Sequence, residues 1–298
     1  MTGGLSPDVL PLFRELGDLK RIHSADRIGS IAERLFIGGW AALVAGMPVG
    51  EVMERIVAAA LAAARLGDLD AAKLRLLGLA AGGTTVLEAG FDAVTSDLDA
   101  GLRSRLSATL AAGAPPTGAT PAFVGKLAWQ PRAGVTCPGR ARVVLQPSEN
   151  HAEHCLMVAV YAVIASPWYD ADPAEAFLAA MAHHLHNAEM PDSGYTGEML
   201  LGAALDGVIV RARDNALAEL PASLAEQVRA ALAPIAGDAT PEAKAFHVAD
   251  VLDRVLEIDQ HLRTRQLTMA AVLDEYGLVH DGPVKPFHDR ILADAGLA

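Results

Sequence analysis

Apolar residues return along the first half of the chain at the three- and four-residue spacing of helices. Residues 24–46 begin amphipathic and become apolar throughout, as a helix does where it enters a core. Helical patterns also cover 50–66, 70–81 and 95–112. The first half is therefore predicted to be a series of helices joined by short turns.

The second half continues the helical pattern and adds recognisable start signals. Ser, Thr and Asp side chains can accept hydrogen bonds from the free N–H groups of a first turn, and proline is tolerated there. The expected starts are Ser148 before a helix that carries His151 and His154, Asp172 before 173–188, Ser223 with Glu226 before 224–233, and Thr240 before 241–263.

Composition supports a helical fold. The chain is 52% hydrophobic but only 5% aromatic, and alanine and leucine carry most of the apolar content. Both are strong helix formers, whereas the residues that favour pleated sheets are sparse. We therefore expect an all-α protein built as a helical bundle.

One stretch interrupts the pattern. Residues 113–140 hold five prolines and five glycines, and no helical period survives there. We expect a Pro/Gly-rich connector over 113–144, between a helical domain of residues 1–112 and a second helical domain of residues 145–298.

Charge and cysteine content exclude several classes of function. A net charge of −12 argues against a nucleic-acid partner, which needs a basic surface. The two cysteines have no metal-site or disulfide spacing, and no secretory signal or membrane span stands out. The expectation is a cytoplasmic protein that acts on a small molecule, without membrane contact, and a homo-oligomer is a candidate assembly.

The two halves resemble each other. A shift of 120 residues lays 32–46 on 152–166 and puts Arg34 opposite His154. One further residue of shift puts Ala62 and Ala63 opposite an adjacent histidine pair. Chance similarity between alanine-rich helices is the alternative to duplication. If the halves are copies, the first has lost every candidate ligand and is a scaffold.

Histidines gather in the second half. Five of the ten lie within 36 residues, and a His247/Asp250 pair follows on the next long helix. Imidazole and carboxylate groups are common ligands of zinc, iron and manganese, and helical bundles build such sites from inward-facing side chains. The expected metal ligands are His154, His183, His184 and Asp250.

The order of these residues resembles the HD-domain superfamily, whose pattern is H…HD…D on a helical bundle. His154 stands in AEHCLMVAVYAVIAS, AAMAHHLHNA is similar to the family's helix ending in the dyad, and HVADVLDRV is similar to its last helix. The resemblance covers about 145 through 265. It implies a divalent metal ion and a metal-dependent phosphohydrolase.

The dyad departs from the family's pattern. In the preferred register His184 replaces the aspartate, and in a second register the pair is His186 and Asn187. An imidazole offers one nitrogen where a carboxylate could bridge two ions. We therefore expect a mononuclear centre of Fe, Mn, Co, Zn or Mg. Glu189, Asp192 or Glu198 are candidates for a missing carboxylate.

Other residues are assigned roles around this centre. His151, His186 and Asp253 are the candidate catalytic residues, with Asp253 also placed to orient a ligand from behind. The candidate substrate contacts are Glu189, Arg211 and Arg254, against the simpler interpretation of solvated helix surface.

Three functions follow. The first is a metal-dependent phosphohydrolase acting on a small, nucleotide-like phosphorylated substrate. The second is an iron-dependent oxygenase of a small organic substrate, a branch that uses two further histidines. Only His186 and His247 stand in that interval. The third is a non-catalytic module that binds a ligand or a partner.

Overall fold

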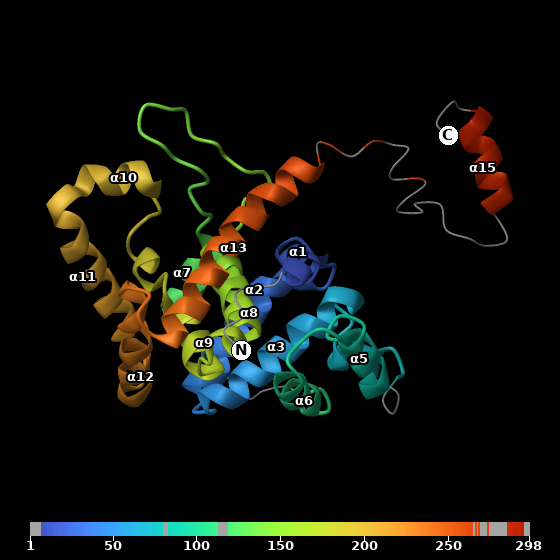
Figure 1. The fold of residues 1–298 in the computed structure, drawn as a ribbon, viewed down its shortest axis with the longest axis horizontal. Helices are drawn as coiled ribbons and strands as arrows, with labels where there is room; N and C mark the ends of the chain where they lie inside the picture. The colour runs from blue at the N-terminus through green and yellow to red at the C-terminus, as the bar shows by residue number, and fades with distance from the viewer. Residues whose placement is uncertain are drawn as a thin grey trace. The chain divides into compact units, whose positions relative to one another are not determined.

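The structure of the protein is a computed structural model that describes residues 7–79, 83–112, 119–264, 266, 268, 273 and 285–294. Helices make up nearly all of its regular structure (Figure 1). Within the described residues the named strands form one two-stranded antiparallel sheet, β1 His23–Ser24 and β2 Arg27–Ser30. The predicted all-α fold is confirmed.

The helices of the first half are short, apart from two. They are α1 Leu10–Gly17, α2 Ile31–Val44, α3 Val49–Leu66, α4 Ala71–Leu76, α5 Gly83–Asp92 and α6 Ala100–Ala108. The second half contains α7 Ala122–Trp129, α8 His151–Tyr169, α9 Pro173–Ala182, α10 Gly194–Leu201, α11 Leu205–Leu217, α12 Ala222–Leu232, α13 Pro241–Thr264 and α15 Lys285–Asp294.

The chain divides into two compact units, residues 1–256 and 257–298. The second unit contains the last residues of α13 and the helix α15. All of the side chains discussed below as a candidate site lie in the first unit.

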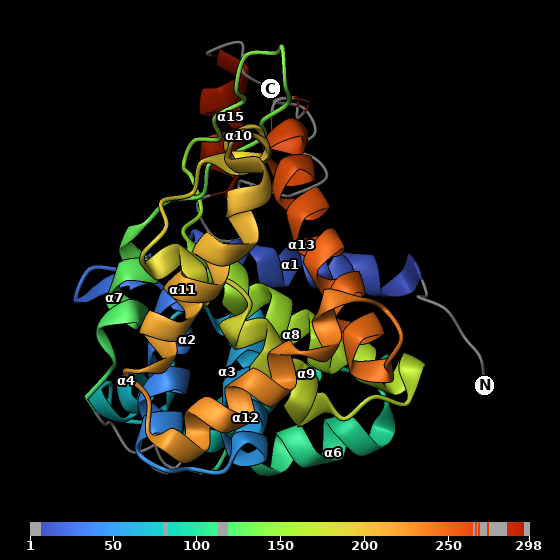
Figure 2. The ribbon, with the colours of Figure 1, turned by 90° about the vertical axis from the view of Figure 1, so that its left-hand side faces the viewer.

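Helix α8 is the central element of the first unit. Its residues from His151 to Ser166 are buried without a gap, so no side of it faces solvent over this stretch. A helix that is buried all round must be enclosed by other elements. Helices α9, α2 and α7 pack against it (Figures 1 and 2).

The start of α8 is fixed by a capping box. The Asn150 side chain accepts a hydrogen bond from the Glu153 backbone N–H at 2.9 Å, and the Glu153 carboxylate accepts one from the Asn150 backbone N–H at 2.8 Å. Ser148, predicted as the cap, is two residues too early. Asparagine is an equally good cap, and here the glutamate at the third helical position selects it.

Helix α9 starts as predicted and ends earlier. Asp172 caps its first turn, and Pro173 occupies the first position. The helix stops at Ala182 and does not run to residue 188. A short 3₁₀ turn, Leu185–Ala188, follows. The chain therefore changes direction between His183 and His184, which decides the geometry of the site.

Several other expected elements differ from the structure. Residues 24–30 belong to the β1–β2 hairpin and do not start a helix, because Gly29 has a φ of +82° and Ser30 caps α2. Helix α12 follows Pro221 and has no side-chain cap, so Ser223 and Glu226 do not form the predicted box. The helices expected over 70–81 and 95–112 are shorter, and α5 was not expected.

The hydrophobic core draws on both halves of the chain. Trp40 of α2 packs edge-on against Phe123 of α7, with ring centroids 5.0 Å apart, so the Pro/Gly-rich segment contains a core helix. Helices α3 and α9 also contact each other. The division into domains at 113–144 stays a prediction, but the two halves share one core.

Among the described residues, no helix combines the length and the apolar content needed to cross a bilayer.

Candidate metal centre

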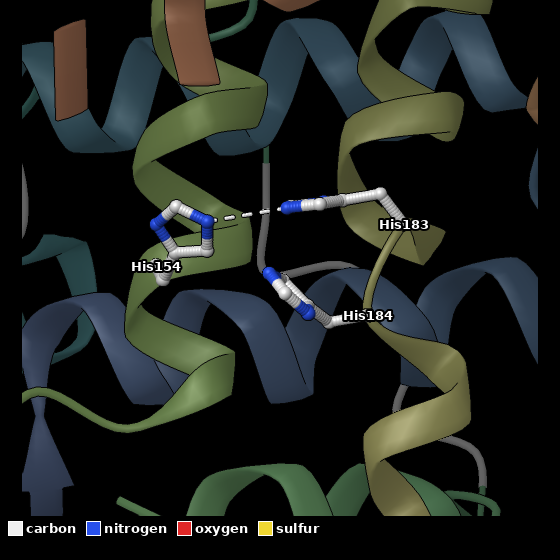
Figure 3. A group of neighbouring side chains, drawn as sticks. All are labelled: His154, His183 and His184. Carbon is white, nitrogen blue, oxygen red and sulfur yellow. Dashed lines mark hydrogen bonds between the residues drawn. The ribbon is translucent and has the colours of Figure 1, made fainter. Parts of the chain in front are cut away.

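Three histidines from two helices converge in the first unit (Figure 3). His154 comes from the first turn of α8, and His183 and His184 from the end of α9. One ring nitrogen from each lies within 4.8 Å of the others. The Nε2 atoms of His154 and His183 are 3.2 Å apart, and Asp250 Oδ1 of α13 lies 3.3 Å from His154 Nε2.

The end of α9 explains why two adjacent residues reach one point. Successive residues of a helix point about 100° apart. His183 is the last position with helical backbone, and His184 has a φ of −101° and a ψ of +17°, which lies outside the helix. The two rings therefore turn back toward each other, with centroids 4.2 Å apart.

Each of the three rings has its Nδ1 atom engaged by an acceptor. His154 Nδ1 donates to Asp253 Oδ2 at 2.7 Å, and His183 Nδ1 donates to the Ala180 carbonyl at 2.6 Å. His184 Nδ1 donates to Asn187 Oδ1 at 2.7 Å. In a neutral imidazole the other nitrogen then carries a lone pair. All three Nε2 atoms are therefore acceptors.

These lone pairs face one another with no donor between them. Burial and neighbouring histidines lower the pKa of His183 to about 3 and the pKa of His184 well below its usual range, so these two rings are uncharged at neutral pH. A metal cation bound between the rings would satisfy their lone pairs. Zinc–nitrogen bonds of about 2.05 Å in a tetrahedral site put neighbouring ligand atoms about 3.3 Å apart. The His154–His183 and His154–Asp250 separations match that spacing, and three nitrogens with one carboxylate suit a transition metal.

Asp250 supplies the negative charge of this group. Its burial works against ionisation, but the neighbouring His154 and His183, together with Arg254, hold the pKa of Asp250 well below its usual range. Arg254 Nη1 lies 3.7 Å from Asp250 Oδ2, with the arginine side chain 61% exposed. The carboxylate is therefore ionised at neutral pH.

A second layer of charge lies behind His154. The Asp253 carboxylate is 1% exposed and accepts both the His154 N–H and, at 2.8 Å, the Lys20 ammonium. Lys20 also contacts Glu149 at 2.6 Å, and Arg132 lies 3.2 Å from the other oxygen of Glu149. Two cations and two carboxylates balance in a buried site.

The charges of this layer reinforce one another. Burial raises the pKa of Asp253, but Lys20 and His154 lower it further, so the net direction is down. Burial likewise opposes the charge of Arg132, and Glu149 and Asp253 raise its pKa beyond its usual range. Glu149, His154 and Asp253 could by spacing hold an ion. The Lys20 ammonium already supplies the positive charge there.

Sequence reasoning missed Lys20, Glu149, Arg132 and Asn187. Lys20 is 129 residues from Glu149, so no local spacing connects them. The segment around Arg132 looked like a connector. Asn187 was predicted only as a member of an alternative dyad, with His186. In the structure it accepts from His184 and donates to the Met190 carbonyl.

His151 and His186 flank the three-histidine group. Their ring centroids are 4.8 Å and 5.6 Å from that of His184. Burial and Arg132 lower the pKa of His151 to about 2, and burial and Arg213 lower that of His186 to about 4. Among the described residues, both nitrogens of His151 and Nδ1 of His186 are buried without a hydrogen-bond partner. The carboxylate nearest to His151 is Asp192, whose Oδ2 lies 3.6 Å from His151 Nε2.

Not all of the predicted substrate contacts lie near the histidine group. Glu189 forms an exposed ion pair with Lys126. Arg211 is exposed on α11, and within the described part of the chain no hydrogen bond or ion pair joins it to the histidines. His247 donates to the Gly237 carbonyl at 3.0 Å, outside the group. Of the three predicted substrate contacts, Glu189 and Arg211 lack a contact with the cluster, whereas Arg254 lies beside Asp250.

Comparison with known proteins gives one match. A family model described as HD domain matches residues 124–280, just over half of the chain. The chain belongs to the HD-domain family. HD domains form a superfamily of the metal-dependent phosphohydrolase type, and they usually bind divalent metal ions. No curated protein and no solved structure matches the chain.

The HD-domain match spans α7 to beyond α13 and so includes every residue of the histidine group. It begins after α2 and α3, although both helices pack against the matched part. It also excludes Lys20, which contacts Asp253. Which residues correspond to the family's dyad stays a prediction.

Proposed function

We propose that the chain is a metal-dependent phosphohydrolase of small phosphorylated compounds, with one divalent ion held by His154, His183, His184 and Asp250. The observation that carries the proposal is the set of three Nε2 lone pairs beside an ionised carboxylate. Such an arrangement is costly without a cation. A nucleotide-like substrate is the finer proposal, and it rests on family membership.

The ion would lower the pKa of a bound water and polarise a phosphoryl oxygen. The protein's own groups prepare the site. Asp253 holds the His154 proton on Nδ1 and increases the basicity of Nε2. Asn187 does the same for His184 with a neutral amide. Lys20 keeps Asp253 ionised, and Glu149 holds the Lys20 ammonium in place.

Two histidines are available to contact a phosphoryl group. His151 and His186 are uncharged at neutral pH, so each offers one N–H donor and one acceptor. Their low pKa values make them weak bases, and we assign them to hydrogen bonding with phosphoryl oxygens. Arg132 and Arg213 add positive charge near these two rings, which favours an anionic substrate.

The test begins with metal content. Protein purified without added metal or chelator should hold one ion per chain, and His183→Ala should lose it. His247→Ala is the matched control, because His247 lies on α13 outside the group. Protein loaded with Mn²⁺, Co²⁺ or Mg²⁺ should then release phosphate from a panel of nucleoside mono- and triphosphates.

The outcomes separate the candidate functions. Release of phosphate that disappears in His183→Ala and persists in His247→Ala supports the proposal. Bound iron with oxygen uptake, and no phosphate release, would assign the oxygenase instead. A chain without metal whose melting temperature ignores chelators would refute the metal site and leave a non-catalytic module.

A further inference from the structure

The first half of the chain contains a cavity whose lining includes no residue of the histidine group. It has a volume of about 470 Å³ and lies among α2, α3, α4 and α5. Cavities of this size hold small organic molecules. Its floor is largely alanine from α3, and four arginines and two aspartates stand among its lining residues. The arginines are Arg27, Arg34, Arg55 and Arg75.

The two halves of the chain are related by a reciprocal contact. Ser30 caps α2 through the Glu33 backbone, as Asn150 caps α8 through the Glu153 backbone. Ser30 Oγ then donates to Glu153 Oε1 at 2.6 Å, and Asn150 Nδ2 donates to Glu33 Oε2 at 2.9 Å. Both pairs differ by the same 120 residues. Such an exchange is the signature of a two-fold relation.

This relation places the cavity opposite the histidine group. The residue 120 positions before His154 is Arg34, and those 121 positions before His183 and His184 are Ala62 and Ala63. All three line the cavity. Where the second half has converging imidazoles, the first half has open space with a guanidinium at its side.

The charge of the cavity sets the class of ligand. Arg27 contacts Asp68 at 3.2 Å and Asp70 at 2.6 Å, and Arg34 contacts Asp68 and the Gly29 carbonyl. These contacts hold the guanidinium groups in place, and each retains further N–H donors. Four arginines against two aspartates leave a positive excess, although the whole chain carries −12.

We propose that this cavity binds a small organic anion with an apolar body, without a metal ion. Guanidinium groups would take the phosphate or carboxylate, as they do in bidentate recognition. The alanine-lined floor would take the apolar part. The first half is then a ligand site and not only a scaffold.

The test is calorimetric titration of the full chain with 1-naphthylphosphonate in the presence of EDTA. One saturable site is expected, and the neutral 1-naphthylmethanol should bind at least about tenfold more weakly. Arg75→Gln should weaken binding about tenfold, because it removes an exposed cation at the cavity edge. Ala63→Phe should abolish binding by filling the space. The control is Arg65→Gln. Arg65 is exposed on α3, the helix that also carries Ala63, and it pairs with Glu15.

Three results would overturn the proposal. The first is no binding, or equal binding of the neutral analogue. The second is unchanged affinity in Arg75→Gln and in Ala63→Phe, with both variants shown to be folded by circular dichroism. The third is binding that is measured without EDTA and disappears when EDTA is present, which would locate the probe at the histidine group. The result does not depend on whether the chain hydrolyses phosphate, because the assay measures binding to metal-free protein.

Discussion

Asp253 offers the sharpest test of the site, because it contacts a proposed ligand from behind and does not face the cluster centre. Asp253→Asn keeps the shape of the side chain and one acceptor oxygen, but removes the charge that His154 and Lys20 share. Loss of such a supporting carboxylate lowers metal affinity by about 10- to 100-fold. This corresponds to about 1.4 to 2.7 kcal/mol of binding free energy.

The same substitution also affects folding. The Lys20 side chain is 2% exposed and would lose the Asp253 charge while keeping Glu149, at 2.6 Å. Breaking a buried ion pair costs about 3 to 5 kcal/mol, and the remaining partner favours the lower end. The double variant Lys20→Met with Asp253→Asn removes the unbalanced cation. It should recover part of the stability but not the metal affinity.

The assay separates these two effects. Affinity is measured by competition of each variant with a chromophoric chelator for Co²⁺, and stability by urea unfolding in EDTA. Glu226→Gln, an exposed carboxylate on α12, serves as the control for loss of a charge. If folded Asp253→Asn binds Co²⁺ as tightly as the unmodified chain, Asp253 does not orient His154 and the reasoning is wrong.

Three further predictions concern the dyad, a pH dependence and the core. His184→Asp should raise the bound metal from one ion toward two per chain in elemental analysis, because a carboxylate can bridge ions, and an unchanged ratio would contradict this. Burial raises the pKa of Asp70, but the bonds from Arg27 and the α4 backbone lower it below 3.8, so its contribution to stability is present above that pH and is lost as the pH falls through the lowered value. Asp70→Asn keeps the α4 cap. It should lower the free energy of unfolding in urea by up to about 1 kcal/mol at about pH 6, because the side chain is half exposed, and this deficit should shrink toward about pH 2.5. A deficit that stays constant with pH would count against the ion pair. Tyr161→Phe leaves the buried Phe13 carbonyl without its 2.5 Å donor and should cost about 1 to 2 kcal/mol in urea unfolding, with metal content unchanged; a loss of metal would show a wider role.

Local signals predicted much of the fold. Asp172 before Pro173 and Thr240 before Pro241 start helices as expected, since a side-chain cap acts within three residues. The end of α9 was not predicted, because AAMAHHLHNA contains neither glycine nor proline. Packing of the histidines, and not propensity, ends that helix.

The residues of the candidate site were likewise only partly predictable from the sequence. His154, His183, His184 and Asp250 could be chosen from the sequence, because their residue types and helical context indicate a site. Lys20 and Arg132 could not, since long-range charge pairs leave no trace in spacing. No sequence pattern connects the arginines of the first-half cavity, which the fold places around one space.

The exchange of caps between α2 and α8 also bears on how the chain is made. A ribosome adds about 5 to 20 residues per second, so roughly 6 to 23 seconds separate the end of α3 from the end of α9. During this interval the faces of α2 and α3 that contact α8 and α9 have no partner, and Glu33 has no Asn150 to contact. These apolar faces of the newborn first half stay uncovered until the second half is made, which exposes them to aggregation.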